Sequence, residues 1–328
     1  MADVSIDAPD GDRLREADRG QLLVVTGLVM AVSLVALVVL LNATIYSENV
    51  ATRGIEADDG EAAAFRASAV EGVGELVDAT NRAGPPPNAT VNDTVLTGVE
   101  DLDRRIARSY AERGGVTRIE TDASGLTRGT YLDTDGNATS LANATNATAY
   151  GFSGEIERTR GFVLDLDADA LATTTAGNAT SEAFHVAFDG SALSESSEVY
   201  VYRNGGGEVV VANGTGGTAP TPRCSVAVDP GDRVSLDLTA ERLEETACVG
   251  VWPTELIAPT DSYAVDFGNA DAADGTAIAT VRPAGTGAAP DHADVSPAVY
   301  DATVELRYRT TELRFGTTVR VAPGEPRA

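Results

Sequence analysis

The sequence predicts an α+β protein: an N-terminal transmembrane helix that extends into a helical neck, followed by a β-sandwich-like antiparallel head domain. Three observations predict this order. Residues 22–41 form an apolar run without a charge, and two apolar stripes at helical spacing follow on either side of a triple proline. From about residue 115 the apolar residues alternate with polar ones, which is the period of a strand with one buried face.

The apolar run is long enough to span a bilayer. It reads LLVVTGLVMAVSLVALVVLL, from Leu22 to Leu41, and a helix of this length rises about 30 Å, the thickness of the hydrocarbon core. Core helices rarely reach this length without a polar face. A cleaved secretory signal has a shorter apolar run and a small-residue cleavage site, for which Asn42-Ala43-Thr44 is a weak candidate. We therefore expect a transmembrane helix over residues 21–47.

Arginines near the ends of the run predict its orientation. Arg13, Arg15 and Arg19 precede the run, whereas Arg53 is the only arginine within fifteen residues after it. Because positive residues favour the cytoplasmic side, we expect residues 1–20 to form a cytoplasmic leader and the C-terminal domain to be extracellular. The predicted location is the cell membrane, in a single pass.

The chain is strongly acidic. Its 328 residues carry 50 acidic and 24 basic side chains, a formal net charge of -26, and every basic residue is arginine. This charge argues against a nucleic-acid partner, and a patterned apolar fraction of 43% argues against disorder. An acidic surface without lysine and with few aromatic residues resembles that of haloarchaeal proteins, in which strong salt screens the repulsion between like charges.

The junction before the apolar run resembles the class III signal peptide of archaeal type IV pilin-like proteins. It reads Asp18-Arg19-Gly20-Gln21. In that family a peptidase cuts after the glycine, so the resemblance implies a processing site between Gly20 and Gln21, and pilin-like or envelope proteins as partners. The sequence departs from the family at Val25, where pilins carry an acidic residue that registers subunits during assembly. An ordinary uncleaved anchor is the alternative.

Residues 48–113 are predicted to form the helical neck. A first apolar stripe ends at Gly84-Pro85-Pro86-Pro87-Asn88, because a triple proline breaks a helix, and a second stripe follows. The stripes consist of Phe65, Ala69, Val73, Leu76 and Val77, and of Val95, Val99, Leu102, Ile106 and Tyr110. Asn92 or Asp93 is expected to cap the second helix. The helices form an antiparallel pair or one packs on the head, and core burial explains their apolar faces better than a binding partner does.

Residues 114–328 are predicted to form an extracellular β-rich domain. Apolar faces of period two recur at Phe162-Leu164-Leu166, Phe184-Val186-Phe188, Val234-Leu236-Leu238 and Tyr263-Val265-Phe267. The clearest pattern is a terminal hairpin, with Ala302, Val304, Leu306 and Tyr308 on one strand and Leu313, Phe315, Val319 and Val321 on the next. Many short alternating strands between Gly- and Asn-rich loops favour an antiparallel β-sandwich over a parallel sheet.

The two cysteines, Cys224 and Cys248, both lie in the predicted outside domain, where a disulfide persists. Cys224 shares an apolar face with Val226 and Val228, so it is expected to point into the core. A bridge would close a loop of about 25 residues and add about 3 kcal/mol by the loop-entropy model. Two buried free thiols are the alternative, and the role of the bridge would be structural.

Asn-x-Ser/Thr sequons in the predicted outside domain are candidate glycosylation sites. They lie at Asn88, Asn92, Asn137, Asn143, Asn146, Asn178 and Asn213. A further sequon at Asn42 is too near the predicted span to be used. Asn143 and Asn146 belong to the low-complexity stretch 135–149, which is predicted to be a glycosylated surface loop.

The sequence carries no recognisable motif for catalysis, for a cofactor or for a metal. The two histidines, His185 and His292, have no second ligand at metal spacing, and there is no Gly-x-Ser-x-Gly elbow, P-loop or dinucleotide fingerprint. Asp165, Asp167 and Asp169 alternate along one strand, but Ala170 stands where an EF-hand loop has glycine. The same test fails for a second group, formed by Asp133, Asp135 and Asn137. Solvated acidic faces explain both groups, and we expect no catalytic, cofactor-binding or metal-binding residue.

Three functions follow from these expectations, in decreasing order of support. The first is a non-enzymatic surface protein, a pilin-like or pilus- or secretion-associated structural component. The second is an uncleaved single-pass binding module whose head recognises an envelope glycan, a solute or a protein. The third is an extracellular hydrolase. The expected partners are membrane lipid and pilin-like or envelope proteins, without nucleic acid and without an identifiable small-molecule substrate.

Overall fold

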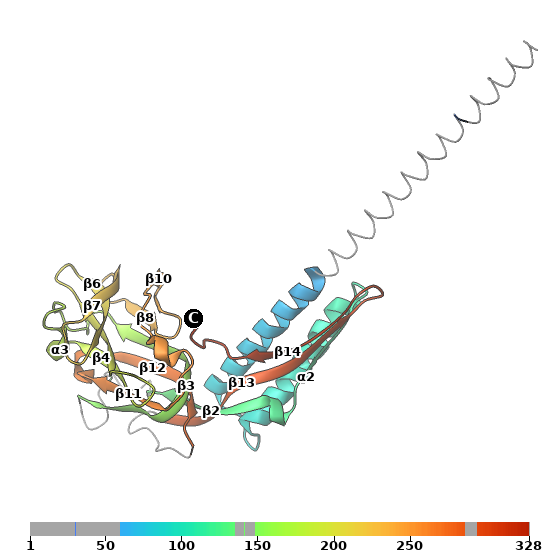
Figure 1. Ribbon diagram of the computed structural model, residues 1–328, viewed down its shortest axis with the longest axis horizontal. Helices are drawn as coiled ribbons and strands as arrows, with labels where there is room; N and C mark the ends of the chain where they lie inside the picture. Colours follow the sequence, from blue (N-terminus) through green and yellow to red (C-terminus); the bar gives the residue numbers. More distant parts are fainter. Residues whose placement is uncertain (1–29, 31–59, 135–140, 142–147, 286–293, 328) are drawn as a thin grey trace, which may run out of the picture. The chain divides into compact units, whose positions relative to one another are not determined.

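A computed structural model describes residues 30, 60–134, 141, 148–285 and 294–327 (Figure 1). The chain divides into two compact units, Met1–Ala63 with Thr311–Leu313, and Ala64–Thr310 with Arg314–Ala328. The second unit carries the features below. The predicted leader and transmembrane segment lie outside the described residues, apart from Met30.

Within the part of the chain that the structure describes, no helix combines the length and the apolar character that a membrane crossing needs.

Residues 60–83 are helical, and the predicted apolar stripe on this helix is buried. Phe65, Ala69, Val73 and Val77 are fully buried, as a core-facing stripe with helical spacing should be. Leu76 is half-buried and lies against the second helix.

The second helix, α2 (Val91–Ala111), starts after the proline-rich turn. The expected cap at Asn92 or Asp93 is wrong, because Thr90 is the N-cap residue. The Thr90 hydroxyl accepts a hydrogen bond from Asp93 N at 3.1 Å, and the Asp93 carboxylate accepts one from Thr90 N at 3.3 Å. This reciprocal pair is a capping box, which satisfies two backbone donors at once.

The two helices approach each other closely at Gly98. A Cβ atom there would lie 2.5 Å from Leu76 Cδ1, so only glycine fits without a shift. Of the predicted α2 stripe, Val95, Val99 and Tyr110 are buried, whereas Leu102 and Ile106 are half-buried.

The rest of the described chain is mainly antiparallel strand, so the predicted β-rich α+β class is confirmed. The strands are β1 (Val116–Glu120), β2 (Leu126–Asp133), β3 (Tyr150–Asp167), β4 (Phe184–Asp189), β5 (Ser197–Arg203), β6 (Glu208–Thr215), β7 (Thr221–Ala227), β8 (Arg233–Asp237), β9 (Arg242–Leu243), β10 (Thr246–Ala247), β11 (Tyr263–Gly268), β12 (Gly275–Pro283), β13 (Asp294–Arg309) and β14 (Arg314–Val321). Short helical turns lie at η1 (Ala123–Gly125), α3 (Ala179–Glu182), η2 (Thr254–Leu256) and η3 (Ala270–Ala272).

The long strand β13 connects the helices to the sheet. Its first half pairs with β2, and its second half lies between β1 and β14, as the predicted terminal hairpin requires. The inward face of the second half packs on the helices, since the Tyr308 ring lies 6.1 Å from Phe65 and 5.9 Å from Tyr110. Figure 1 shows α2 lying along β13.

The described strands form one continuous sheet, in the order β1-β13-β2-β12-β3-β11-β4-β5-β6-β7, with β8, β9 and β10 branching from β3. This differs from the two separate sheets that a β-sandwich contains. The first half of β3 pairs with β11 and its last residues pair with β8, so the sheet divides along β3 into two arms.

A disulfide joins the ends of these two arms, because Cys224 lies in β7 and Cys248 directly follows β10. The disulfide therefore closes a ring of strands, in the order β3, β11, β4, β5, β6, β7, β10, β9 and β8. Its interior is the main core, and the predicted faces of period two point into it: Phe162, Leu164, Leu166, Phe184, Val186, Phe188, Val234, Leu236, Leu238, Tyr263, Val265 and Phe267.

Candidate functional site

Several residues singled out from the sequence lie outside the described residues. They are the predicted processing junction Gly20-Gln21, the sequons at Asn42, Asn137, Asn143 and Asn146, and also Asp135 and His292.

The remaining sequons have different surroundings. Asn88 is exposed in the proline-rich turn with a φ of 66°, and Asn178 is exposed directly before α3. Asn92 is half-buried in the first turn of α2. The exposed positions leave space for a glycan.

Asn213, by contrast, uses its side-chain amide within the protein. Its Nδ2 donates to Gly250 O at 2.7 Å, and its Oδ1 accepts from Arg223 Nε at 2.5 Å. The side chain is half-buried and links β6 to β7 and to the loop after Cys248. A glycan on Nδ2 would disturb this link.

Of the three alternating aspartates, Asp165 and Asp169 form ion pairs, whereas Asp167 accepts a hydrogen bond from Asp169 N at 2.9 Å. Asp165 pairs with Arg233 at 2.9 Å, and Asp169 pairs with Arg203 at 2.7 Å. Among the residues that the structure describes, no group of three or more His, Cys, Asp or Glu side chains could hold a metal ion.

His185 lies on the outer face of β4, where its ring is 5.0 Å from the ring of Tyr200. The Tyr200 hydroxyl donates to Glu198 at 2.7 Å. Burial raises the pKa of Tyr200, and the hydrogen bond to Glu198 raises it further. His185 thus packs against a buried aromatic side chain.

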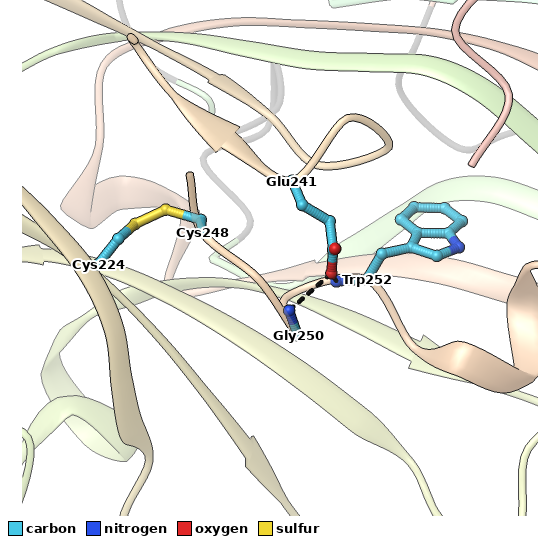
Figure 2. Close-up of a disulfide and its surroundings, with 5 residues drawn as sticks. All are labelled: Cys224, Glu241, Cys248, Gly250 and Trp252. Atoms are coloured by element: carbon cyan, nitrogen blue, oxygen red, sulfur yellow. Dashed lines mark hydrogen bonds between the residues drawn. A yellow bond between two sulfur atoms is a disulfide. The ribbon is translucent and has the colours of Figure 1, made fainter. Parts of the chain in front are cut away.

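The disulfide confirms the predicted pairing, with a Cα–Cα distance of 5.1 Å and with no free cysteine in the described chain. Figure 2 shows the loop that follows Cys248 curving around the side chain of Glu241. The Glu241 carboxylate accepts from Gly250 N at 2.7 Å and from Trp252 N at 3.2 Å, and Cys248 N donates to Glu241 O at 2.7 Å.

Glu241, which binds this loop, has a backbone conformation that is unusual for a residue other than glycine. Its φ is 53°, in the left-handed region that disfavours side chains with a Cβ. Positive φ at a non-glycine residue persists where the surroundings compensate for it. Here the three hydrogen bonds to the loop supply that compensation.

A pocket of about 920 Å³ opens beside this loop. It is lined by Thr239, Ala240, Glu241, Val249, Gly250, Trp252, Thr254, Glu255, Ile257, Ala258 and the C-terminal residues 324–327. Trp252 is 3% exposed and packs edge-on against Phe188, and its Nε1 has no hydrogen-bond partner in the described chain. An apolar and aromatic wall with a few charged groups is typical of a ligand-binding pocket.

The C-terminal residues 324–327 also border a second pocket, of about 780 Å³, whose other wall is the helix of residues 60–83. Glu71, Glu75 and Asp78 contribute its acidic side. The end of the chain therefore lies between the helix and the loop after the disulfide.

Arg160 fastens the helix, the sheet and the end of the chain together. It is 1% exposed, and its guanidinium donates to Tyr300 O at 2.6 Å, to Val299 O at 3.0 Å, to Pro323 O at 3.0 Å and to the Asp78 carboxylate at 2.5 Å. A buried arginine is tolerated when its charge is paired and its donors are bonded.

Sequence reasoning missed Arg160. Simple alternation would place it on the same face as Phe162 and Leu164, but the register of β3 against β12 shifts between Arg160 and Val163. Thr159 therefore bonds to Tyr263 of the main core, and Arg160 points to the other face of β3, where its acceptors lie.

Glu325 completes this network near the C-terminus. It accepts hydrogen bonds from Arg320 at 2.6 and 3.0 Å and from the Tyr300 hydroxyl at 3.0 Å. Burial opposes its charge, but the hydrogen bonds and the charge of Arg320 outweigh burial and hold the pKa of Glu325 below its usual value.

The fold and the pocket define a β-rich α+β protein with two helices packed on one sheet that a disulfide closes. Residues 16–131 of the chain are similar to a family of unknown function, DUF7261. The similar stretch includes Gly20, the helix of residues 60–83, α2 and β1, and it ends within β2. Neither the curated proteins nor the solved structures compared with this chain gave a match.

Proposed function

We propose that this chain is a non-enzymatic, membrane-anchored cell-surface protein, a pilin-like or pilus- or secretion-associated structural component. In this proposal residues 1–20 are a cytoplasmic leader, residues 21–47 span the membrane, residues 48–113 form the neck and residues 114–328 face the outside. The observation that carries it is the attachment of the helix of residues 60–83 to the sheet.

This helix is integrated into the head rather than tethered to it. From Phe65 to Val77 its apolar stripe is buried, and at its end Asp78 binds Arg160 while Asn81 binds Val299. Because the helix is held along its length, it and the strands that it contacts move as one body. This favours a structural component over a head on a flexible linker, for which Gly- and Ser-rich connections are typical.

The similarity to DUF7261 covers the same part of the chain. It begins at residue 16, just before Arg19-Gly20-Gln21, and it includes both helices. The junction, the apolar run and the helix pair thus form the stretch that this chain shares with a family, which is consistent with an anchored structural role.

The first experiment is mass spectrometry of the N-terminal peptide of the protein purified from its own membrane. A mature chain that begins at Gln21 supports prepilin-type processing. The Gly20→Leu variant is the matched control, because it should retain residues 2–20. A wild-type chain that also retains residues 2–20 would contradict the pilin-like proposal.

A binding module is the second candidate, and the pocket beside the disulfide loop favours it. Trp252 is the only tryptophan in the chain and lines this pocket, so intrinsic fluorescence reports directly on its occupancy. Titration of the full chain with soluble envelope-glycan fragments should shift the emission if the head binds them. The Trp252→Phe variant, which lacks the fluorescent side chain, is the control. If no glycan fragment shifts the emission of the wild type, the result counts against a binding module.

A further inference from the structure

The outward face of the sheet formed by β1, β13 and β14 is exposed and rich in arginine. Strand pairing places Arg118 opposite Arg307, and Arg309 opposite Arg314. All four side chains are exposed. We call these four residues the basic face. Such a cluster of exposed positive charge is unexpected in a chain whose net charge is -26.

Within the basic face the two arginine pairs differ. Like charges directly opposite each other on neighbouring strands destabilise a sheet. Arg118 and Arg307 are compensated, because Arg118 pairs with Glu120 at 3.0 Å and Arg307 pairs with Glu305 at 2.8 Å.

Arg309 and Arg314 have no such compensation. Neither forms an ion pair with any residue that the structure describes. They line a shallow hollow of about 580 Å³ together with Val116, which lies opposite Arg309 and is 66% exposed. Two unpaired guanidinium groups beside an exposed apolar side chain are suited to an acidic protein surface, since Arg binds a carboxylate through two parallel hydrogen bonds.

A second copy of this chain offers such a surface at the other end of the sheet. Asp167, Asp229, Asp232 and Asp274 lie together there, joined by the main-chain hydrogen bonds Asp167 N to Asp274 O at 2.8 Å and Asp232 N to Asp229 O at 3.2 Å. We call these four residues the acidic edge. Across the described ranges, none of the four has an arginine partner.

The basic face and the acidic edge lie at opposite ends of β13. The acidic edge is where β3 ends and β8 and β12 begin, and the antiparallel register of β12, β2 and β13 places this edge beside the start of β13. The basic face lies at the end of β13, which is 16 residues long. At the usual rise of a strand this separates the two surfaces by about 50 Å.

We propose that the basic face binds the acidic edge of a second copy of this chain. Because the two surfaces differ, the contact is heterologous, and its repetition joins copies head to tail in an open row. The inference adds to the proposed structural function the surface through which copies meet. Processing at Gly20 is measured on the N-terminal peptide, so either idea can fail without the other.

The absence of lysine allows a selective test. In an Arg314→Lys variant of the full chain, position 314 carries the only side-chain amine, and a carbodiimide joins it without a spacer to a carboxylate that it touches. Unlabelled and ¹⁵N-labelled chains, purified from membranes and mixed, distinguish links between copies from links within one copy. The matched control is Arg105→Lys, at an exposed position on α2.

The expected result is mixed-isotope links from position 314 to peptides that contain Asp229 and Asp232 or Asp274, at least about tenfold above the control. Links confined to one copy, links equal to the control, or links to another protein would overturn the proposal.

Charge reversal provides an independent check. The Arg309→Glu/Arg314→Glu chain and the Asp232→Arg/Asp274→Arg chain should each lose self-association by about tenfold or more, and their mixture should recover it. If the mixture associates no better than either chain alone, the assigned pair of surfaces is wrong.

Discussion

Asn81 and Val299 exchange two hydrogen bonds. Asn81 Nδ2 donates to Val299 O at 2.9 Å, and Val299 N donates to Asn81 Oδ1 at 2.9 Å. Val299 lies where the register between β13 and β2 shifts before Asp301, so the side chain of Asn81 satisfies backbone groups next to a bulge. The helix of residues 60–83 is therefore fixed to one position along β13.

The first prediction concerns this pair. Asn81→Ala should lower the free energy of unfolding by about 1–3 kcal/mol for each buried group left without a partner. Urea unfolding of the full chain measures the loss. Ser68→Ala, at an exposed position of the same helix, should leave the midpoint unchanged. Equal midpoints for both variants would show that the pair does not hold the helix.

The second prediction concerns pH and Glu325. Its pKa is lowered in the folded protein, so its ionisation stabilises the fold above the ordinary pKa of 4.5, and this contribution is lost as the pH falls through the lowered value. Glu325→Gln should therefore be less stable than the wild type at neutral pH, with the difference shrinking in acid. Unfolding curves from about pH 7 to pH 3 test this.

A matched control is needed because the chain has many other carboxylates. Glu255→Gln replaces an exposed carboxylate, and its difference from the wild type should stay small throughout. A gap between the wild type and Glu325→Gln that is as large in acid as at neutral pH would contradict the role assigned to Arg320 and Glu325.

The third prediction concerns the disulfide. Cys224 and Cys248 are 24 positions apart, and their bond joins the two arms of the sheet. Reduction followed by thiol blocking should lower the free energy of unfolding by about 3 kcal/mol. Because β7 pairs with β6 on one side only, hydrogen exchange should accelerate first in β7. Uniform acceleration across the sheet, or none, would argue against closure by this bond.

The fourth prediction concerns glycosylation. Glycopeptide mapping of the native protein should find occupied sites at the exposed Asn88 and Asn178 and an unmodified side chain at Asn213, whose amide is bonded to Gly250 and Arg223. The variant Asn213→Ala should destabilise the protein even where no glycan is attached. A glycan found on Asn213 would show that this link does not form in the mature protein.

Patterns of local spacing predicted much of the fold. The stripe that contains Phe65 and Val73 became a buried helix face, and the alternation that ends at Tyr308 became the terminal hairpin. Both succeed because one-sided burial imposes its own period on a helix or a strand. The cap of α2 was misplaced by a few residues, since Thr90 and Asp93 define it together.

Features that depend on distant residues were not predictable in this way. The closed ring of strands depends on β3 pairing with two different strands along its length, which no local pattern encodes. Arg160 was missed for the same reason, because its acceptors come from positions as far apart as Asp78 and Pro323.

The sequence by itself determined the order of helices and strands, the faces that they bury and the pairing of its two cysteines, because periodicity and composition act over short stretches of chain. Only the tertiary structure decided how the sheet closes, where the helix attaches, and which arginines remain unpaired. Whether Arg160 is bonded within the fold or Arg314 is left free depends on which acceptors the folded backbone brings near. That outcome is a property of contacts between distant segments, which the spacing of neighbours does not contain.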